Sequence, residues 1–205
     1  VPPGQPIPGD CALIVLPGSK ASLADMEAMR AQGWDIDVIA HHRRGGAILG
    51  ICGGYQMLGQ TLSDPHGIEG APGAVPGLGL LDCTTVLTPR KALREVAGTA
   101  WGQPFTGFEM HMGQTTGPDC ARPFALLDGA RPDGAISPDG RVIGSYVHGA
   151  LASTGLRAAL LDRLGARSDG HDHAARVDAA LDAIAQTLEQ HVDIDALLAI
   201  AHQGA

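Results

Sequence analysis

The sequence predicts an α/β protein with a mostly parallel sheet flanked by helices, followed by a C-terminal helical appendage. Apolar runs at 11–16 (CALIVL) and 47–51 (AILGI) alternate with helix-like segments. Neither run alternates apolar with polar residues, so each is expected to be covered on both faces, as the strands of a parallel sheet are. Beyond residue 173, apolar residues recur at the spacing of a helix.

The first third of the chain is predicted to hold two strands and three helices. Ser22 is a candidate N-cap for the first helix, with Asp25 near the capping-box position, and Gly33 is placed to end that helix. The predicted elements are strand 11–16, helix 23–32, helix 36–43, strand 47–51 and helix 53–62. This order favours a parallel sheet with helices on both faces.

The pattern changes after a Gly- and Pro-rich stretch at 63–80, which is predicted to be a loop. Four strands and then three helices are expected in the rest of the chain, at 83–88, 105–112, 124–127 and 141–147, and at 154–164, 173–191 and 194–202. The polar stretch RSDGHDH is interpreted as a short hinge. We therefore predict a main domain at 1–166 and a helical appendage at 167–205.

Composition argues against several classes of protein. The formal net charge is −8, which disfavours a nucleic-acid-binding surface. No apolar run approaches the ~20 residues of a membrane span, and the N-terminus lacks the regions of a signal peptide. Four widely spaced cysteines without a CxxC pair make neither a zinc site nor a disulfide framework expected, so we predict no metal site and a cytoplasmic location. The chain lacks an initiator Met, so we expect it to come from a longer protein.

Cys52 is the candidate nucleophile. The stretch GAILGICGGYQMLG places it between a predicted strand and a predicted helix, with Gly50 two residues before it and Gly54 two residues after it. This G-x-C-x-G pattern is the thiol counterpart of a nucleophile elbow, in which small residues allow a strained turn and close approach of neighbouring backbone. The following helix N-terminus is expected to favour the thiolate. The alternative is a buried structural cysteine at a glycine-rich turn.

His148 is the candidate base. In VIGSYVHGAL it ends a predicted strand, at the sheet edge where α/β proteins gather their active sites. His111, within GFEMHMG, is the other serious candidate. His41 and His42 lie on a predicted surface helix beside two arginines and are interpreted as solvated. The remaining histidines lie in loops or on terminal helices.

Taken together, five segments resemble the C-terminal glutamine amidotransferase domains of the cobyric acid synthase family. They are LPGSK, GGAILGICGGYQMLG, GLGLLDCTT, GFEMHMGQT and GSYVHGAL, which occur in this order with the family's spacing, and DPHGIEG at 64–70 also fits. The resemblance covers roughly residues 12 to 165. It implies the class I amidotransferase fold, which is flavodoxin-like. Because that fold normally has a strand before the segment matching CALIVLPGSK, we expect the chain to begin inside the domain.

The resemblance also implies an activity. Enzymes of this family amidate carboxylates of a corrin ring with ATP and glutamine. The glutaminase domain is expected to hydrolyse glutamine and to need no cofactor of its own. ATP and magnesium are expected in an N-terminal domain, absent here, which would bind ATP and the corrinoid. The expected partners are therefore glutamine and that domain.

Roles carried over by resemblance concern the oxyanion and the substrate. The backbone amides of Gly18, in LPGSK, and of Gly53 would stabilise the tetrahedral oxyanion formed when the Cys52 thiolate attacks glutamine. Gln56, one helical turn after Cys52, would contact the substrate glutamine. The alternative for Gln56 is a polar residue on the helix surface.

A triad carboxylate is missing from its usual place. Related amidotransferases have a Glu two residues after the catalytic His, whereas this chain reads His148-Gly149-Ala150. Glu109 and His111 lie two apart on a predicted strand and therefore face the same side. Glu109 is the candidate orienter of the His148 ring, and the alternative is a structural hydrogen-bonded pair.

Three other interpretations of the function remain open on the sequence alone. One is a glutaminase subunit that supplies ammonia for lipid II amidation in cell walls, which shares the Cys/His pair. A second is a catalytically inactive amidotransferase-like docking module, which the retained Cys52, Gly18, Gln56 and His148 argue against. A third is a cysteine protease or hydrolase on a similar fold, because spacing alone does not specify glutamine.

Overall fold

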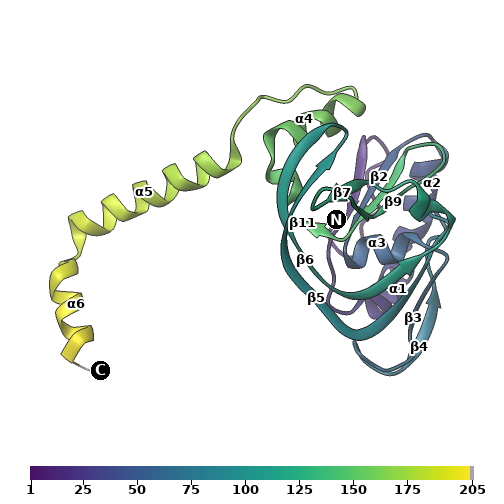
Figure 1. Cartoon of the computed structure of the whole chain (residues 1–205), viewed down its shortest axis with the longest axis horizontal. Helices are drawn as coiled ribbons and strands as arrows, with labels where there is room; N and C mark the ends of the chain where they lie inside the picture. Colours follow the sequence, from purple (N-terminus) through teal and green to yellow (C-terminus); the bar gives the residue numbers. More distant parts are fainter. Residues whose placement is uncertain (204–205) are drawn as a thin grey trace.

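Two sheets make up the body of the computed structural model, which describes residues 1–203 (Figure 1). The first has the order β1-β2-β10-β9. Its parallel strands are β1 (Leu13–Leu16), β2 (Ala47–Ile51) and β10 (Val142–Ser145), and β9 (Ala135–Ile136) runs antiparallel at the edge. This sheet corresponds to the predicted mostly parallel sheet, and the α/β class is confirmed.

The second sheet is mainly antiparallel and was not predicted as a separate layer. Its order is β11-β6-β5-β3-β4, with β7 and β8 attached at the side of β5. The strands are β3 (Thr61–Asp64), β4 (Gly73–Pro76), β5 (Thr84–Ala100), β6 (Gln103–Thr116), β7 (Ala125–Leu127), β8 (Arg131–Asp133) and β11 (Val147–His148). The long β5–β6 hairpin, visible as the large curved ribbons in Figure 1, replaces the two shorter strands predicted at 83–88 and 105–112.

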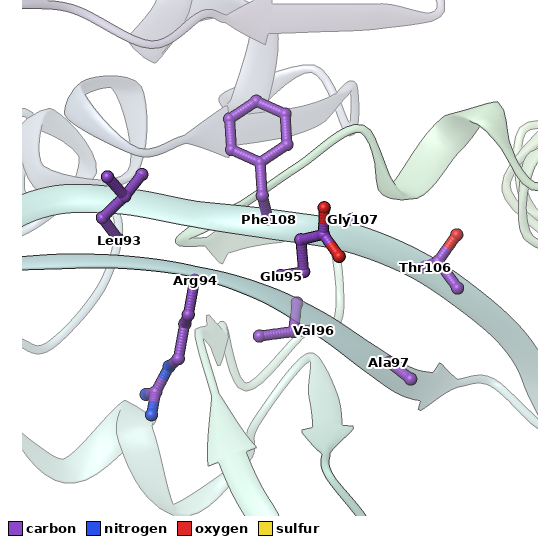
Figure 2. Close-up of a pocket in the computed structure, with 8 residues that line it drawn as sticks. All are labelled: Leu93, Arg94, Glu95, Val96, Ala97, Thr106, Gly107 and Phe108. Carbon is purple, nitrogen blue, oxygen red and sulfur yellow. The ribbon is translucent and has the colours of Figure 1, made fainter.

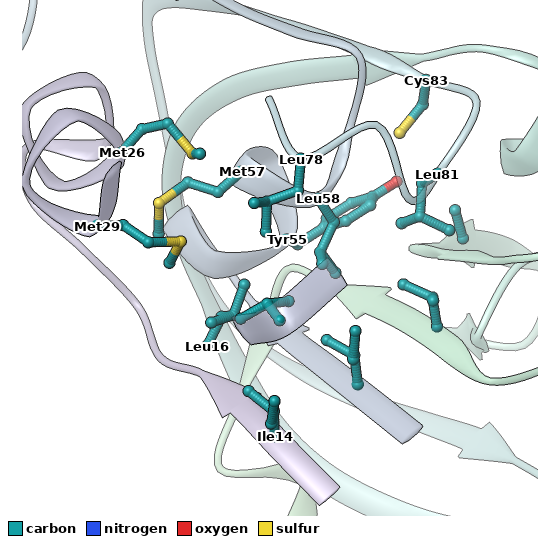
Figure 3. Close-up of a cluster of buried hydrophobic side chains, with 14 of the residues drawn as sticks. Ile14, Leu16, Met26, Met29, Tyr55, Met57, Leu58, Leu78, Leu81 and Cys83 are labelled. Atoms are coloured by element: carbon teal, nitrogen blue, oxygen red, sulfur yellow. The ribbon is translucent and has the colours of Figure 1, made fainter. Parts of the chain in front are cut away.

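Helices close to the first sheet supply much of its core. They are α1 (Ser22–Ala31), α2 (Trp34–Arg43) and α3 (Gly53–Leu58). Figure 3 shows methionines of α1 together with Tyr55, Met57 and Leu58 of α3 in one apolar cluster above Leu16 of β1. Burial of these side chains anchors α3, and with it the turn that precedes α3.

Two local predictions near this cluster were wrong. The helix expected over 53–62 ends at Leu58, and the chain then forms β3 inside the segment predicted as helix and loop. Ser22 is not the N-cap of α1, because Ala21 holds that position and the Ser22 hydroxyl bonds instead to Gln56 and Glu69. The predicted end of this helix at Gly33 is confirmed, since Gly33 adopts φ 74°.

His41 also differs from its prediction. It was expected to be solvated, but its side chain is buried and its Nε2 lies 3.0 Å from the Ala47 carbonyl. His42 is partly exposed and pairs with Asp139 at 3.1 Å. The first contact ties α2 to β2, and the second ties α2 to the connection between β9 and β10.

Short 3-10 turns lie between β6 and β7, at Pro118–Ala121, and before α4, at Ala150–Ala152, and three helices follow the sheets. They are α4 (Thr154–Arg163), α5 (His173–His191) and α6 (Ile194–Gln203), all close to their predicted bounds. Helix α4 packs on the body through Leu156, whereas α5 and α6 extend away from the sheets in Figure 1 and α5 buries no residue. The proposed division at 166/167 stays a prediction. Across residues 1–203, none of the helices combines the length and the apolar character that a membrane span requires.

Candidate active site

Cys52 stands on a strained turn between β2 and α3. Its backbone adopts φ 53° and ψ −111°, a region that residues with a side chain rarely occupy. A Cβ added at Gly54 would lie 2.0 Å from the Leu16 carbonyl oxygen, and one at Gly50 would lie 2.6 Å from Leu58 Cδ1. The strand-turn-helix geometry predicted from G-x-C-x-G is thus confirmed, together with the steric reason for both glycines.

One cavity of about 460 Å³ brings most of the predicted site residues together. Cys52, His148, Gly18 and Gln56 all line it, and so does His111. A larger hollow of about 920 Å³ lies along the β5–β6 hairpin, lined by residues 93–97 and 106–108 (Figure 2). Because that hollow contains neither thiol nor imidazole, the smaller cavity is the candidate active site.

The environment of Cys52 favours the protonated thiol over the thiolate. Its side chain is buried, and Sγ donates to the Met110 carbonyl oxygen at 3.4 Å. Burial raises the pKa of the thiol, the Gly53 N–H lowers it and the negative charge of Glu69 raises it, with a net rise. The expectation that the helix N-terminus favours the thiolate is therefore outweighed by desolvation, and the sulfur needs a base.

His148 is held beside the thiol by β11. This strand pairs with β6 so that His148 lies opposite Phe108, whose ring stacks on the imidazole at 5.1 Å between centroids and 10° between planes. Burial lowers the pKa of His148, and a hydrogen bond with the Met110 carbonyl partly opposes this. Its Nε2 is buried and has no hydrogen-bond partner among residues 1–203. A largely neutral imidazole with a vacant nitrogen can serve as a general base.

Gly18 lies against both groups. A Cβ built on it would meet Cε1 of His148 at 2.8 Å, Nδ1 of the same ring at 3.7 Å and Cβ of Cys52 at 3.7 Å. Only a residue without a side chain therefore leaves the imidazole where it stands. This position is compatible with the predicted role of the Gly18 amide toward an oxyanion at the sulfur.

Substituting Gly18→Ala should lower the turnover of glutamine by about 100-fold, because the added methyl displaces the His148 ring while the backbone N–H is retained. The measurement is steady-state hydrolysis, with thermal unfolding as the check on folding. Gly9→Ala is the matched control, since a Cβ there meets nothing within 4 Å. Wild-type turnover in Gly18→Ala would contradict the placement of His148.

Gln56 is a buried residue of α3, so the alternative of an exposed helix-surface side chain is wrong. It is 2% exposed, and its Oε1 accepts from the Ser22 hydroxyl at 2.9 Å. The Tyr146 hydroxyl also bonds to Gln56 and to Thr115. Gln56 therefore lines the cavity as part of a buried polar network, and a contact with substrate stays a prediction.

Glu109 does not orient His148, and this prediction is corrected. Its carboxylate accepts from Arg94 Nε at 2.6 Å and from Arg131 at 3.0 and 2.8 Å. Burial alone would raise the pKa of Glu109, but hydrogen bonds from Arg131 and Arg94 outweigh it and hold the pKa below its usual value. Its other neighbour is Nε2 of His111, at 3.9 Å from Oε1. Both carboxylate oxygens accept hydrogen bonds from arginines. The alternation of side chains along β6 does not by itself reveal these partners.

Glu109→Gln should therefore lower the free energy of unfolding by about 2 kcal/mol, since two arginines would lose a buried anionic partner. The pKa of Glu109 is depressed in the folded protein, so this contribution is present above the unfolded-state pKa and is lost as pH falls through the folded-state pKa. Urea unfolding of wild type and variant at neutral and acidic pH measures it. An unchanged stability difference at acidic pH would contradict the ionised buried pair.

His111 lines the cavity but is fixed by other contacts. Its ring stacks on Tyr146 at 3.8 Å between centroids, and Nδ1 lies 3.0 Å from the Gly113 carbonyl. Because a carbonyl oxygen only accepts, Nδ1 carries the proton. Burial is the main cause that lowers the pKa of His111, and it outweighs the opposing effect of the bond with Gly113.

Sequence reasoning missed two charged residues of the cavity, Glu69 and Lys91. The Glu69 carboxylate accepts from the Ser22 backbone N–H at 2.5 Å, and its own N–H donates to Asp64 at 2.9 Å. Burial, chiefly, raises the pKa of Glu69. The sequence held a signal for Glu69, because this residue lies in DPHGIEG, a segment that fits the family. No cluster of three or more potential metal ligands was found among residues 1–203.

Comparison with known proteins agrees with this geometry. Residues 1–155 match the model of the CobB/CobQ-like glutamine amidotransferase domain. Relatives named cobyric acid synthase include one from Rhizorhabdus wittichii, 65% identical over 100% of this chain, and one from Sphingopyxis alaskensis, 64% identical over 98% of it. The chain spans 42% and 41% of the length of these two relatives.

A solved structure described as a glutamine amidotransferase shares the fold, with a TM-score of 0.55 and 19% identity over 75% of this chain and 79% of that one. The family resemblance drawn from the sequence motifs is confirmed by the family model and by these relatives. This chain belongs to the CobB/CobQ-like glutamine amidotransferase domain family.

Proposed function

We propose that this domain hydrolyses glutamine at Cys52 and that the ammonia serves ATP-dependent amidation of corrin-ring carboxylates. The observation that carries the proposal is the shared cavity, in which a thiol on a strained turn and an imidazole with a vacant nitrogen both lie against Gly18. The names of the relatives support the corrinoid as the final acceptor.

The chemistry begins with proton transfer. His148 takes the proton of the Cys52 thiol, whose pKa is raised, as the sulfur attacks the side-chain amide carbon of glutamine. The oxyanion that forms accepts from the backbone amides of Gly18 and Gly53. When the carbon–nitrogen bond breaks, the imidazolium returns the proton to nitrogen and ammonia leaves. A thioester remains on Cys52.

Water completes the reaction. His148 accepts a proton from water, the hydroxyl adds to the thioester carbon, and the carbon–sulfur bond breaks to release glutamate and the Cys52 thiol. Glu69 is suited to bind the α-ammonium of glutamine, because among the described residues no cation pairs with its carboxylate. Gln56 lines the same cavity and is proposed to contact the substrate.

The proposal includes a partner and a location. The rest of a longer protein, in the manner of the relatives, would bind ATP, magnesium and the corrinoid and would use the ammonia; this domain needs no cofactor for the hydrolysis itself. Cytoplasmic location is part of the proposal, and the four free cysteines fit a reducing compartment.

The test is glutamine hydrolysis by the full-length protein that contains this chain, measured with and without ATP and a corrinoid carboxylate. The proposal expects hydrolysis and amidation of the corrinoid. Hydrolysis that supports amidation of lipid II instead would favour the cell-wall alternative. Absence of hydrolysis under all conditions would favour an inactive docking module.

A further inference from the structure

The two lysines of the chain, Lys20 and Lys91, both line the candidate cavity. Every other basic residue of the chain apart from histidine is an arginine, and no arginine lines the cavity in the described part of the chain. The cations available to a bound substrate are therefore ammonium groups on flexible stems, which bind carboxylates as compact point charges.

An irregularity of the β5–β6 ladder places Lys91. Leu87 pairs with Gly113 and Ala92 pairs with His111, so residues 88–91 of β5 face a single residue of β6. Extra residues in one strand form a bulge, and bulges near active sites commonly redirect a side chain. Here the bulge brings Lys91 to the cavity wall, beside the segment that carries His111.

The same sheet edge brings Lys91 toward Glu69. Strand β3 runs parallel to β5, with Ser63 opposite Val86. The loop after β3, which carries Glu69, and the bulge after Leu87, which carries Lys91, therefore leave the sheet in the same direction. Both side chains line the cavity, yet no ion pair joins them within residues 1–203. Lys91 also makes no side-chain hydrogen bond to those residues, so its ammonium is available to a ligand.

A cation and an anion that share a cavity without pairing match an α-amino acid, whose ammonium and carboxylate are attached to one carbon. We propose that Lys91 binds the α-carboxylate of the substrate glutamine, beside Glu69 at the α-ammonium, and so selects free glutamine over glutamine whose α-carboxylate is blocked. This inference rests on the proposed function. Lys20 lines the cavity as well, but the β5 bulge places Lys91, and not Lys20, beside the segment that carries His111.

The test compares Lys91→Met with Lys91→Arg and Arg90→Met in the full-length protein. Lys91→Met should raise the KM for glutamine about tenfold with kcat nearly unchanged, because a charge-assisted contact to the bound amino acid is lost. Lys91→Arg should recover most of that loss. Arg90→Met is the matched control. It removes the same charge at the neighbouring position, where the side chain is exposed and does not line the cavity.

Two further measurements test whether Lys91 binds the α-carboxylate of glutamine. The wild type should prefer glutamine to its α-methyl ester, and Lys91→Met should lose most of this preference. Glutamine should also protect Lys91 from acetylation in a Cys52→Ala background, as read from the peptide containing Lys91. Equal KM values for Lys91→Met and Arg90→Met, or no protection, would overturn the assignment while leaving the hydrolase intact. A wild type without glutamine hydrolysis would overturn the proposed function and this inference together.

Discussion

Cys52→Ala should lower glutamine hydrolysis by about 10⁴-fold or more, while the full-length protein still amidates its acceptor with free ammonia. The variant removes the only thiol that lines the candidate cavity in the described structure, so no thioester can form. Ammonia bypasses this step because it is the product that the domain is proposed to supply. Parallel assays with glutamine and with ammonium salts measure the two activities.

Cys83→Ala is the matched control for this substitution. Cys83 is also a buried free thiol, its pKa is raised by burial to about 12, and it lies in the apolar cluster of the first sheet instead of the cavity. Its replacement should leave glutamine hydrolysis close to wild type. Glutamine turnover by Cys52→Ala at more than a few per cent of wild type, with Cys83→Ala unchanged, would exclude Cys52 as nucleophile.

The nucleophile turn could be predicted because its cause is local. The apolar strand, the two glycines and the following helix are contiguous in sequence. Each glycine avoids a clash that a Cβ would make with nearby backbone or with Leu58. His148 was expected at the end of one strand over 141–147, but that stretch divides into β10 and β11, and His148 lies in β11 of the second sheet. Confirmation that the two share one cavity with Gly18 required the tertiary structure.

The wrong predictions lie where contacts with distant parts of the chain decide which local structure forms. After Leu58 the chain could continue the helical pattern, but β3 pairs with both β4 and β5, and this pairing fixes 61–64 as a strand. Ser22 has the side chain of a helix cap, yet Glu69, 47 residues later, accepts from its backbone N–H. Neither partner is visible from a local window of sequence.

The polar residues around the site show the same limit. The strand pattern placed Glu109 and His111 on one face, but Arg94 and Arg131, which hold Glu109, come from β5 and β8. Lys91 depends on a bulge, whose existence is apparent only from the register of β5 against β6. Residue type and spacing therefore predicted the reacting groups better than the groups that surround them.

His148→Gln should lower kcat by about 10²- to 10⁴-fold, because glutamine keeps much of the side-chain volume but cannot take a proton from the thiol. Steady-state hydrolysis across a range of pH gives the decisive readout. In the wild type, His148 must be neutral to act as base, and its pKa lies below the usual 6.5. As pH falls, activity should therefore persist below pH 6.5 before it declines.

The variant should show a different dependence on pH. Without the imidazole, residual hydrolysis needs the free thiolate, and the pKa of the Cys52 thiol lies above its usual 9.0 because the side chain is buried. Residual activity should thus have no decline linked to an imidazole and should rise with pH into the alkaline range. His42→Gln, which alters a histidine paired with Asp139 outside the cavity, should keep the wild-type profile. If His148→Gln retained the acidic limb, another group would be the base, and His111 is the remaining imidazole that lines the cavity in the described structure.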